Sequence, residues 1–488
     1  MQFQKTVLSL FVLAALGATV GAQSASADNH KSKYSNEAIV THGVASGDVS
    51  SDSAVIWSRS NTEATMHVIL TGKGNERAMH RRVSVSAEND FTGKIKLTGL
   101  KANTEYEYRV WFGNDNADGA VRGHFKTAPE NTTPMAVSFA WGGDLAGQNT
   151  CRDATEGFPI FNAINKQELD FFIGLGDMIY ADGTCESTGR YGNTQVAGDF
   201  IPAADMPNYW AHWKYNREDN GFQTLLASMP YYAIWDDHEV VNDFGPLHDT
   251  RDSAPYTAGE KLLPKGLNAF LDYNPIVEDS NTPKRLYRSI AWGKNMEMFI
   301  LDTRQYRDAN FEADSAEHPK TMLGREQMVW LKSALKNSSA TWKIIVSSVP
   351  MSIPTGSAGP RGRDGWANYE QDGGFEYELK ELLRYMQKNG MNNVAFLTTD
   401  VHFAEVFHYV PFADAPDFEV YEFVSGPINA GVFPNRAYDA SLNTESLFFY
   451  GADSASDVNV RMEYWSHPLQ LRLLERVFRM QINAHLVH

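Results

Sequence analysis

The chain has 488 residues, a formal net charge of −17 at pH 7 and only 2 cysteines. This length suffices for two or three domains with a large core, and the charged fraction of 21% is typical of a soluble globular protein. Such an acidic protein is not expected to bind nucleic acid or anionic lipid through a basic surface. An anionic substrate would instead need local cations, which bound metal ions could supply.

Residues 1–27 have the features of a secretory signal peptide. Lys5 provides the positive start, Thr6–Val20 is nearly free of polar residues, and Ala25-Ser26-Ala27 is a small-residue cleavage site. The alternative, an uncleaved membrane anchor, is disfavoured because the apolar stretch is short for a spanning helix. We therefore expect a periplasmic or secreted protein with no transmembrane segment after removal of the signal.

Residues 38–127 have an all-β pattern. The clearest strands are Met66–Leu70, Arg82–Ser86, Lys94–Leu100 and Tyr106–Phe112. The run LKANTEY followed by EYRV resembles the late-strand region of fibronectin type III-like sandwiches, in which a buried tyrosine, here Tyr106, hydrogen-bonds back to the backbone. We predict a β-sandwich domain that ends at a linker, Ala128–Pro134.

From residue 135 to 465, strands alternate with helices, which predicts an α/β domain. The expected strands are Met135–Ala140, Phe171–Leu175, Tyr231–Trp235, Met296–Leu301, Trp342–Val349, Asn393–Leu397 and Phe418–Val424. The expected helices are Ile160–Gln167, Gly221–Ala227, Gly324–Lys336 and Phe375–Lys388, and a C-terminal helix is expected over residues 466–488. Asp243–Pro283 and Phe433–Asp457 are expected to be irregular loops over the site.

The two cysteines, Cys151 and Cys185, lie in turn-rich sequence. In an oxidising compartment a disulfide between them is the first expectation. The alternative, in which Cys151 is a metal ligand, stays open from the sequence.

Four polar clusters each follow an apolar strand. They are VSFAWGGD with Asp144, FFIGLGDMIY with Asp177 and Tyr180, YYAIWDDHE with Asp237 and His238, and VAFLTTDVH with Asp400 and His402. Ligands of open α/β sheets bind beyond the carboxyl ends of strands, and carboxylates, phenols and imidazoles are ligands for hard or borderline metals. A bridging carboxylate can hold two ions about 3.5–4 Å apart. The chain has no P-loop, GxGxxG, HExxH or GxSxG motif.

As an ordered set, GDMIY, WDDHE and DVH, together with THGVASGD and LDTRQYR, resemble the alkaline phosphatase D (PhoD-like) family of calcineurin-like metallophosphoesterases. The resemblance extends from His42 to about Gly426. It implies an α/β fold with metallophosphoesterase-type central β-sheets flanked by helices, preceded by the fibronectin type III-like sandwich. It also implies an enzyme that hydrolyses phosphoric esters, an alkaline phosphatase or phosphodiesterase.

The resemblance assigns the metal ligands residue by residue. Asp177 would bridge two ions, with Tyr180 and His402 on Fe³⁺ and with Asp237 and Asp400 on a second ion, for which Ca²⁺ is favoured. Zn²⁺ and Mn²⁺ are alternatives at either site. Asp236 and Glu239 are expected to support the ligands.

Three further residues have expected roles. Asp144 aligns with the position at which the best-studied branch has a cysteine ligand, so Cys151 remains its rival. His238 would assist the leaving group as the catalytic acid. Arg304 would contact phosphate or form a buried structural ion pair.

The expected reaction is attack of a metal-bound hydroxide on a phosphomonoester or phosphodiester, without a covalent phosphoenzyme. A phospholipase D-type phosphodiesterase is the alternative within enzymes. A non-catalytic surface binding protein with a vestigial metal site is the alternative of another class. We expect a monomer.

Overall fold

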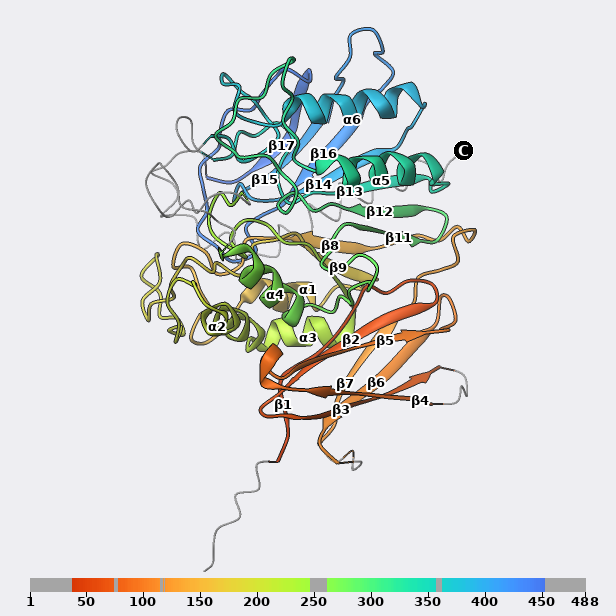
Figure 1. Cartoon of the computed structure of the whole chain (residues 1–488), viewed down its shortest axis with the longest axis vertical. Coiled ribbons are helices and arrows are strands. Elements are labelled where there is room, and N and C mark those ends of the chain that lie inside the picture. Colours follow the sequence, from red (N-terminus) through yellow and green to blue (C-terminus); the bar gives the residue numbers. More distant parts are fainter. Residues whose placement is uncertain are drawn as a thin grey trace, which may run out of the picture. The chain divides into compact units, whose positions relative to one another are not determined.

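Three β-sheets organise the chain (Figure 1). The structure is a computed structural model that describes residues 37–73, 78–114, 117, 119–245, 261–356 and 362–452. The predicted signal peptide and the predicted C-terminal helix lie outside the described residues. None of the described helices is long and apolar enough to cross a membrane.

Two of the sheets carry the α/β pattern. One has six strands in the order β5 (Thr92–Thr98), β2 (Ser53–Ser60), β1 (Val40–Gly47), β10 (Pro230–Ala233), β9 (Phe171–Gly174), β8 (Phe139–Gly142). The other has seven, β11 (Arg288–Trp292), β12 (Met296–Ile300), β13 (Trp342–Val346), β14 (Val394–Thr398), β16 (Val420–Val424), β15 (Ala404–Tyr409), β17 (Thr444–Tyr450). Strands β8 to β10 run parallel to one another, as do β12, β13, β14 and β16.

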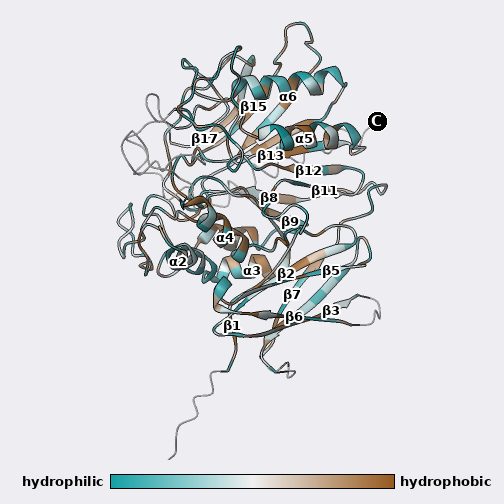
Figure 2. Ribbon diagram, in the orientation of Figure 1, coloured by the Kyte–Doolittle hydropathy of each residue, from teal (hydrophilic) through white to brown (hydrophobic). Residues whose placement is uncertain are grey.

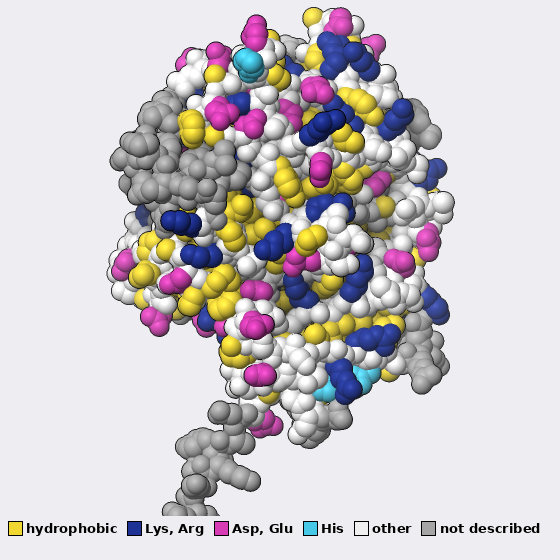
Figure 3. Space-filling view, in the orientation of Figure 1, with side chains coloured by type: hydrophobic (Ala, Val, Ile, Leu, Met, Phe, Trp, Pro, Cys, Tyr) yellow, Lys and Arg dark blue, Asp and Glu magenta, His cyan; other side chains and the backbone are white. Residues whose placement is uncertain are grey.

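These two sheets pack face to face, and helices cover their outer faces (Figure 1). Helices α1 (Pro159–Ile164), α2 (Met206–Arg217), α3 (Asn220–Ser228) and α4 (Leu263–Tyr273) lie on the six-stranded sheet, and α5 (Gly324–Asn337) and α6 (Glu376–Lys388) on the seven-stranded sheet. The core between the sheets includes Phe171, Trp292 and Phe423. Figure 2 shows hydrophobic segments on strands of these two sheets and on helices α3 and α4. The face drawn in Figure 3 carries interspersed acidic and basic side chains. The predicted fold class is confirmed.

A third sheet completes the amino-terminal β-sandwich. It has the order β4 (Met79–Val85), β3 (Ala64–Gly72), β6 (Glu105–Phe112), β7 (Val121–Lys126), and a short 3₁₀ helix, η1 (Ala87–Asn89), precedes β5. The tyrosine predicted to bond back to the backbone does so, because Tyr106 is buried and its hydroxyl accepts a hydrogen bond from the Lys101 N–H at 2.9 Å.

The sandwich does not end at a break in the hydrogen-bonded structure. Strand β1 pairs in parallel with β10, with Ser46 opposite Pro230, so that one sheet runs from the sandwich into the α/β region. The predicted domain limits remain predictions, but the linker over residues 128–134 separates segments that share this sheet.

The expectation that two segments are irregular is wrong in part. Helix α4 lies within Asp243–Pro283, and β17 lies within Phe433–Asp457. Helix α2 was not expected because its buried side chains include the polar Asn216 and Arg217, which interrupt any apolar stripe. Helix α6 follows its pattern, with Leu379, Leu382, Leu383 and Met386 buried.

Candidate metal centre

The four polar clusters meet at the carboxyl ends of β8, β9, β10 and β14. Four of their residues have a left-handed backbone, with φ of 63° at Asp144, 51° at Asp177, 78° at Asp400 and 60° at His402. Such conformations cost non-glycine residues roughly 1–3 kcal/mol each and concentrate at functional sites. Sharp turns therefore direct these side chains to one edge of the two packed sheets.

One group of side chains contains a phenol, an imidazole and a carboxylate. The Tyr180 hydroxyl lies 2.8 Å from Nε2 of His402, and that nitrogen lies 3.6 Å from Oδ1 of Asp144. All three residues are buried. The structure thus brings together the three residues that the family resemblance assigns to the first ion besides Asp177.

The His402 ring is held in one orientation. Its Nδ1 faces the carbonyl oxygen of Gly431, so Nδ1 carries the proton and donates, and Nε2 keeps its lone pair. Burial lowers the pKa of His402 to about 3, so the imidazole is neutral. The Nε2 lone pair accepts a hydrogen bond from the Tyr180 hydroxyl, and a neutral imidazole with a lone pair so directed is the state that a metal ligand needs.

A second group consists of carboxylates alone. Oxygen atoms of Asp177, Asp236, Asp237 and Asp400 lie within 4.8 Å of one another. Among the described residues, none donates a hydrogen bond to four buried oxygens around this edge, which are Asp144 Oδ1, Asp236 Oδ2, Asp237 Oδ1 and Asp400 Oδ2. Arg304 Nη2 approaches Asp237 Oδ1, but only to 3.6 Å. A buried acceptor without a partner costs about 1–3 kcal/mol, and more when it is charged. Carboxylate oxygens without a hydrogen-bond partner are suitable ligands for divalent or trivalent cations.

Electrostatics support the same interpretation. Burial, with added repulsion from Asp236, raises the pKa of Asp144 to about 8 although the Thr399 hydroxyl donates to this carboxylate. Burial and then the charge of Asp237 raise the pKa of Asp177 well above its usual range. The carboxylates can all be ionised at neutral pH only if positive charge is added among them.

His238 lies beside this group and is held by a residue that the sequence did not single out. Its Nδ1 is 2.6 Å from Oδ1 of Asp182, and its ring packs against Tyr180 with centroids 4.1 Å apart. One His238 nitrogen also lies within 4.8 Å of carboxylate oxygens of Asp177 and Asp237. Burial alone would lower the pKa of His238, but the charges of the neighbouring Asp182 and Asp237 raise it to about 10.

Arg304 is buried and fully engaged. Its Nε donates to Asp236 at 2.5 Å, and its Nη1 and Nη2 donate to the two oxygens of Asp364 at 2.6 and 2.8 Å. Arg307 also binds Asp364, at 2.9 Å. Of the two alternatives for Arg304, this arrangement favours the buried ion pair over contact with substrate.

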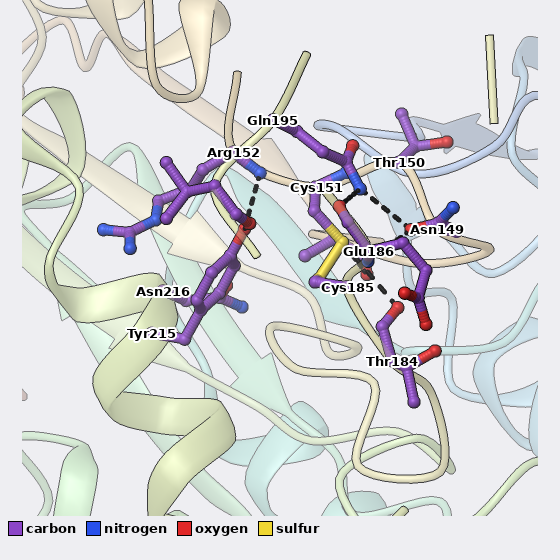
Figure 4. The surroundings of a disulfide bond; sticks show 12 residues. Asn149, Thr150, Cys151, Arg152, Thr184, Cys185, Glu186, Gln195, Tyr215 and Asn216 are labelled. Atoms are coloured by element: carbon purple, nitrogen blue, oxygen red, sulfur yellow. Dashed lines mark hydrogen bonds between the residues drawn. A yellow bond between two sulfur atoms is a disulfide. The ribbon is translucent and has the colours of Figure 1, made fainter. Parts of the chain in front are cut away.

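Cys151 and Cys185 form a disulfide, as the first of the two expectations proposed (Figure 4). The Cys151 N–H donates to Gln195 Oε1 at 3.0 Å, and the Gln195 amide donates to Asn149 at 2.8 Å. Cys151 therefore offers no thiolate, and Asp144 is the residue of the first cluster that lies beside His402.

Several supporting residues have little or no signal in the sequence. Asp182 comes five residues after Asp177, and a carboxylate so close to the motif is the signal that could have indicated it. The Glu239 carboxylate accepts hydrogen bonds from the N–H groups of Asp177, Met178 and Asp236, as its expected supporting role requires. Position 426 requires glycine for a steric reason, since a Cβ there would lie 2.2 Å from Oδ2 of Asp144.

The fold and this edge of open carboxylates define a metallophosphoesterase-type protein. The structure of a purple acid phosphatase from yellow lupin (Lupinus luteus) seeds aligns with a TM-score of 0.55 at 15% identity, covering 85% of this chain and 68% of the other. The structure of PhoD aligns with a TM-score of 0.65 at 23% identity, covering 80% of this chain and 77% of that one.

Sequence comparison identifies the family. The model of the PhoD-like phosphatase matches residues 139–463, and the model of the PhoD-like phosphatase N-terminal domain matches residues 23–129. The chain belongs to the PhoD-like phosphatase family. Alkaline phosphatase D of Bacillus subtilis (strain 168) is 27% identical over 400 residues, which are 74% of this chain but 64% of that protein.

Proposed function

We propose that the protein is an exported, metal-dependent hydrolase of phosphoric esters, with the activity of an alkaline phosphatase or phosphodiesterase. Family membership supports the class of reaction. The observation that carries the proposal is the set of buried carboxylate oxygens of Asp144, Asp236, Asp237 and Asp400 to which no described residue donates a hydrogen bond. An acidic protein of net charge −17 would repel an anionic ester unless cations occupied this edge.

The ligand sets follow from the two groups of side chains. Asp144, Tyr180 and His402 would hold one ion, Asp237 and Asp400 the other, and Asp177 would lie between them. When bound, such ions polarise a phosphoryl oxygen and lower the pKa of a coordinated water. Fe³⁺ at the first site and Ca²⁺ at the second suit these ligands, because a phenol whose pKa is raised by burial needs a strongly acidic cation to ionise.

His238 has the properties of a general acid. Asp182 binds Nδ1, which leaves Nε2 to hold the proton that a departing alkoxide needs. The same ion pair keeps the imidazolium oriented, as a carboxylate bound to the other ring nitrogen of a histidine does in other hydrolytic sites. Asp182 is thus a positioning residue for the catalytic His238.

The test combines metal analysis with two assays on one preparation. We expect purified protein to contain iron and calcium and to hydrolyse a model monoester, a model diester or both, with loss of turnover on chelation and recovery on adding the metals back. A Tyr180→Phe variant should lose any visible absorption band that arises from phenolate and iron. Strong preference for the diester would favour the phospholipase D-type alternative.

One outcome would overturn the proposal. Chelator-insensitive binding of a surface ligand, with no hydrolysis of either ester by metal-loaded protein, would favour the non-catalytic binding protein. Export and the monomeric state are separate proposals, tested by fractionation of cells and by light scattering.

A further inference from the structure

Two exposed arginines, Arg190 and Arg436, each contact a residue that in turn contacts the proposed ligand His402. The guanidinium of Arg436 lies over the ring of Phe433, 5.3 Å from its centroid. The Phe433 ring in turn stacks on His402, with centroids 4.2 Å apart and an interplanar angle of 8°. Arg436 is therefore separated from a proposed metal ligand by a single aromatic ring.

Arg190 reaches the same place from another loop. A Cβ on Gly431 would lie 2.7 Å from Nη1 of Arg190, so the guanidinium packs directly on the backbone of Gly431. That glycine provides the carbonyl to which His402 donates. The next residues are also joined, because the Val432 N–H donates to the Tyr191 hydroxyl at 3.1 Å. The loop that carries Arg190 is thus fixed against the support of His402.

The two arginines differ from the buried arginines of the site in their partners. Arg304 and Arg307 are neutralised by Asp364 and its neighbours, whereas neither Arg190 nor Arg436 forms an ion pair with a described residue. Arg363 lies near Arg436; burial lowers the pKa of Arg363 and the charge of Arg436 lowers it further, although Tyr369 and Glu370 oppose this. Arg190 and Arg436 are thus cations without a described ion-pair partner in a protein of net charge −17.

We propose that Arg190 and Arg436 select substrates that carry a second phosphate group beyond the one that is hydrolysed. This inference rests on the proposed phosphoesterase function and extends it to substrate choice. A guanidinium matches two phosphate oxygens at once, and an exposed guanidinium without a carboxylate partner loses no ion pair when phosphate binds. The aromatic ring under Arg436 restricts its orientations and so lowers the entropic cost of binding.

The test compares phenyl phosphate with hydroquinone bisphosphate, which has a second phosphate on the far side of the same ring. In wild-type protein loaded with metals, we expect kcat/KM to be higher for the bisphosphate after correction for its two equivalent esters. The double variant Arg190→Gln/Arg436→Gln should lower the ratio of the two kcat/KM values by about 10-fold, mainly through KM for the bisphosphate. Arg436→Lys, which keeps the charge but not the fork, should give an intermediate ratio.

Arg325→Gln provides the matched control, because Arg325 is an exposed arginine on α5. It should leave the ratio and the melting temperature unchanged. An unchanged ratio in the double variant, or a wild-type preference for phenyl phosphate, would overturn the inference while leaving the hydrolase intact. Failure of metal-loaded wild-type protein to hydrolyse either ester would instead overturn the proposed function.

Discussion

Two neighbouring clusters of buried carboxylates lie at the same edge of the sheets and differ in the protein donors that pair with them. In the open cluster, defined as Asp144, Asp177, Asp237 and Asp400, three residues have an oxygen that accepts no hydrogen bond from a described residue. The paired cluster is defined as Asp364 with Arg304, Arg307 and Asn310, from all three of which Asp364 accepts hydrogen bonds. Asp144 and Asp364 are equally buried, since Asp144 is 0% exposed and Asp364 is 1% exposed.

The pKa values express this difference. Burial raises the pKa of both carboxyls, and at Asp144 it reaches about 8. At Asp364 the charges of Arg304 and Arg307 outweigh burial and lower the pKa to about 2. Burial alone therefore does not distinguish a structural carboxylate from a ligand; the presence or absence of a protein cation does. Arg304 Nη2 lies 3.6 Å from Asp237 Oδ1, but no described arginine or lysine forms an ion pair with Asp144, Asp177 or Asp400. These three carboxylates lack the positive charge that Asp364 has beside it, and metal ions would supply it.

The largest effect should come from removing the central member of the open cluster. Asp177→Asn keeps the size of the side chain but removes a charge shared by both ligand groups, so metal content and turnover should both fall. We expect a loss of at least about 100-fold, because residues that merely orient ligands already cost 10–100-fold. Metal analysis and kcat measure this, and circular dichroism should show an intact fold.

Asp170→Asn is the control for this variant. Asp170 lies at the other end of β9, where its Oδ2 accepts a hydrogen bond from the Ser138 N–H at 2.9 Å. It should retain metals and turnover. Full activity of Asp177→Asn would contradict the assignment of the open cluster.

A matching change in the paired cluster should affect stability. Asp364→Asn leaves the buried Arg304 and Arg307 without a full countercharge, which typically costs about 3–5 kcal/mol. Denaturant titration would measure this as a lower free energy of unfolding. Asp414→Asn, at the exposed pair with Arg384, should change little. Equal effects of the two variants would show that the paired cluster is not a structural ion pair.

The sequence predicted the open cluster better than the paired one, for a physical reason. Asp177 and His402 follow strands in short motifs, so their location could be read from local pattern and family resemblance. Asp364 binds Arg304 across 60 positions of the chain, and no local pattern records such a contact. For the same reason Arg304 remained ambiguous between phosphate contact and ion pair.

Removal of metals should make the stability of the protein depend on pH. A carboxyl whose folded-state pKa exceeds its unfolded value stabilises the fold below the unfolded pKa, and this contribution is lost as pH rises through the folded pKa. With the pKa of Asp144 raised from 3.8 to about 8 and that of Asp243 to about 7, burial being the first cause of both, the unfolding free energy of the metal-free protein should fall between pH 4 and pH 8. The decrease should be on the order of 5–10 kcal/mol, since each pKa unit corresponds to about 1.4 kcal/mol.

The measurement is the difference between the melting temperatures of metal-loaded and chelated protein at several pH values. Bound cations replace the protons of the open cluster, so the gap between the two preparations should widen as pH rises. A gap that stays constant from pH 5 to pH 8 would show that these carboxylates are not the groups that the metals neutralise.

The smallest effect separates two adjacent threonines that serve different carboxylates. Thr399 Oγ1 donates to Asp144 at 2.7 Å, and Thr398 Oγ1 donates to Glu422 at 2.8 Å; both threonines are fully buried. Among the described residues, Thr399 is the only hydrogen-bond donor to the Asp144 carboxylate, so Thr399→Val should lower affinity for the first metal by about 10–100-fold. Thr398→Val removes a donor from a carboxylate away from the open cluster, so it should cost about 1–3 kcal/mol of stability with unchanged metal affinity.

Metal titration and thermal unfolding of both variants would measure the two effects. If both variants lowered metal affinity equally, the hydrogen bond from Thr399 would not act on a metal ligand in particular. The distinction between the open carboxylate of Asp144 and the structural carboxylate of Glu422 would then be wrong.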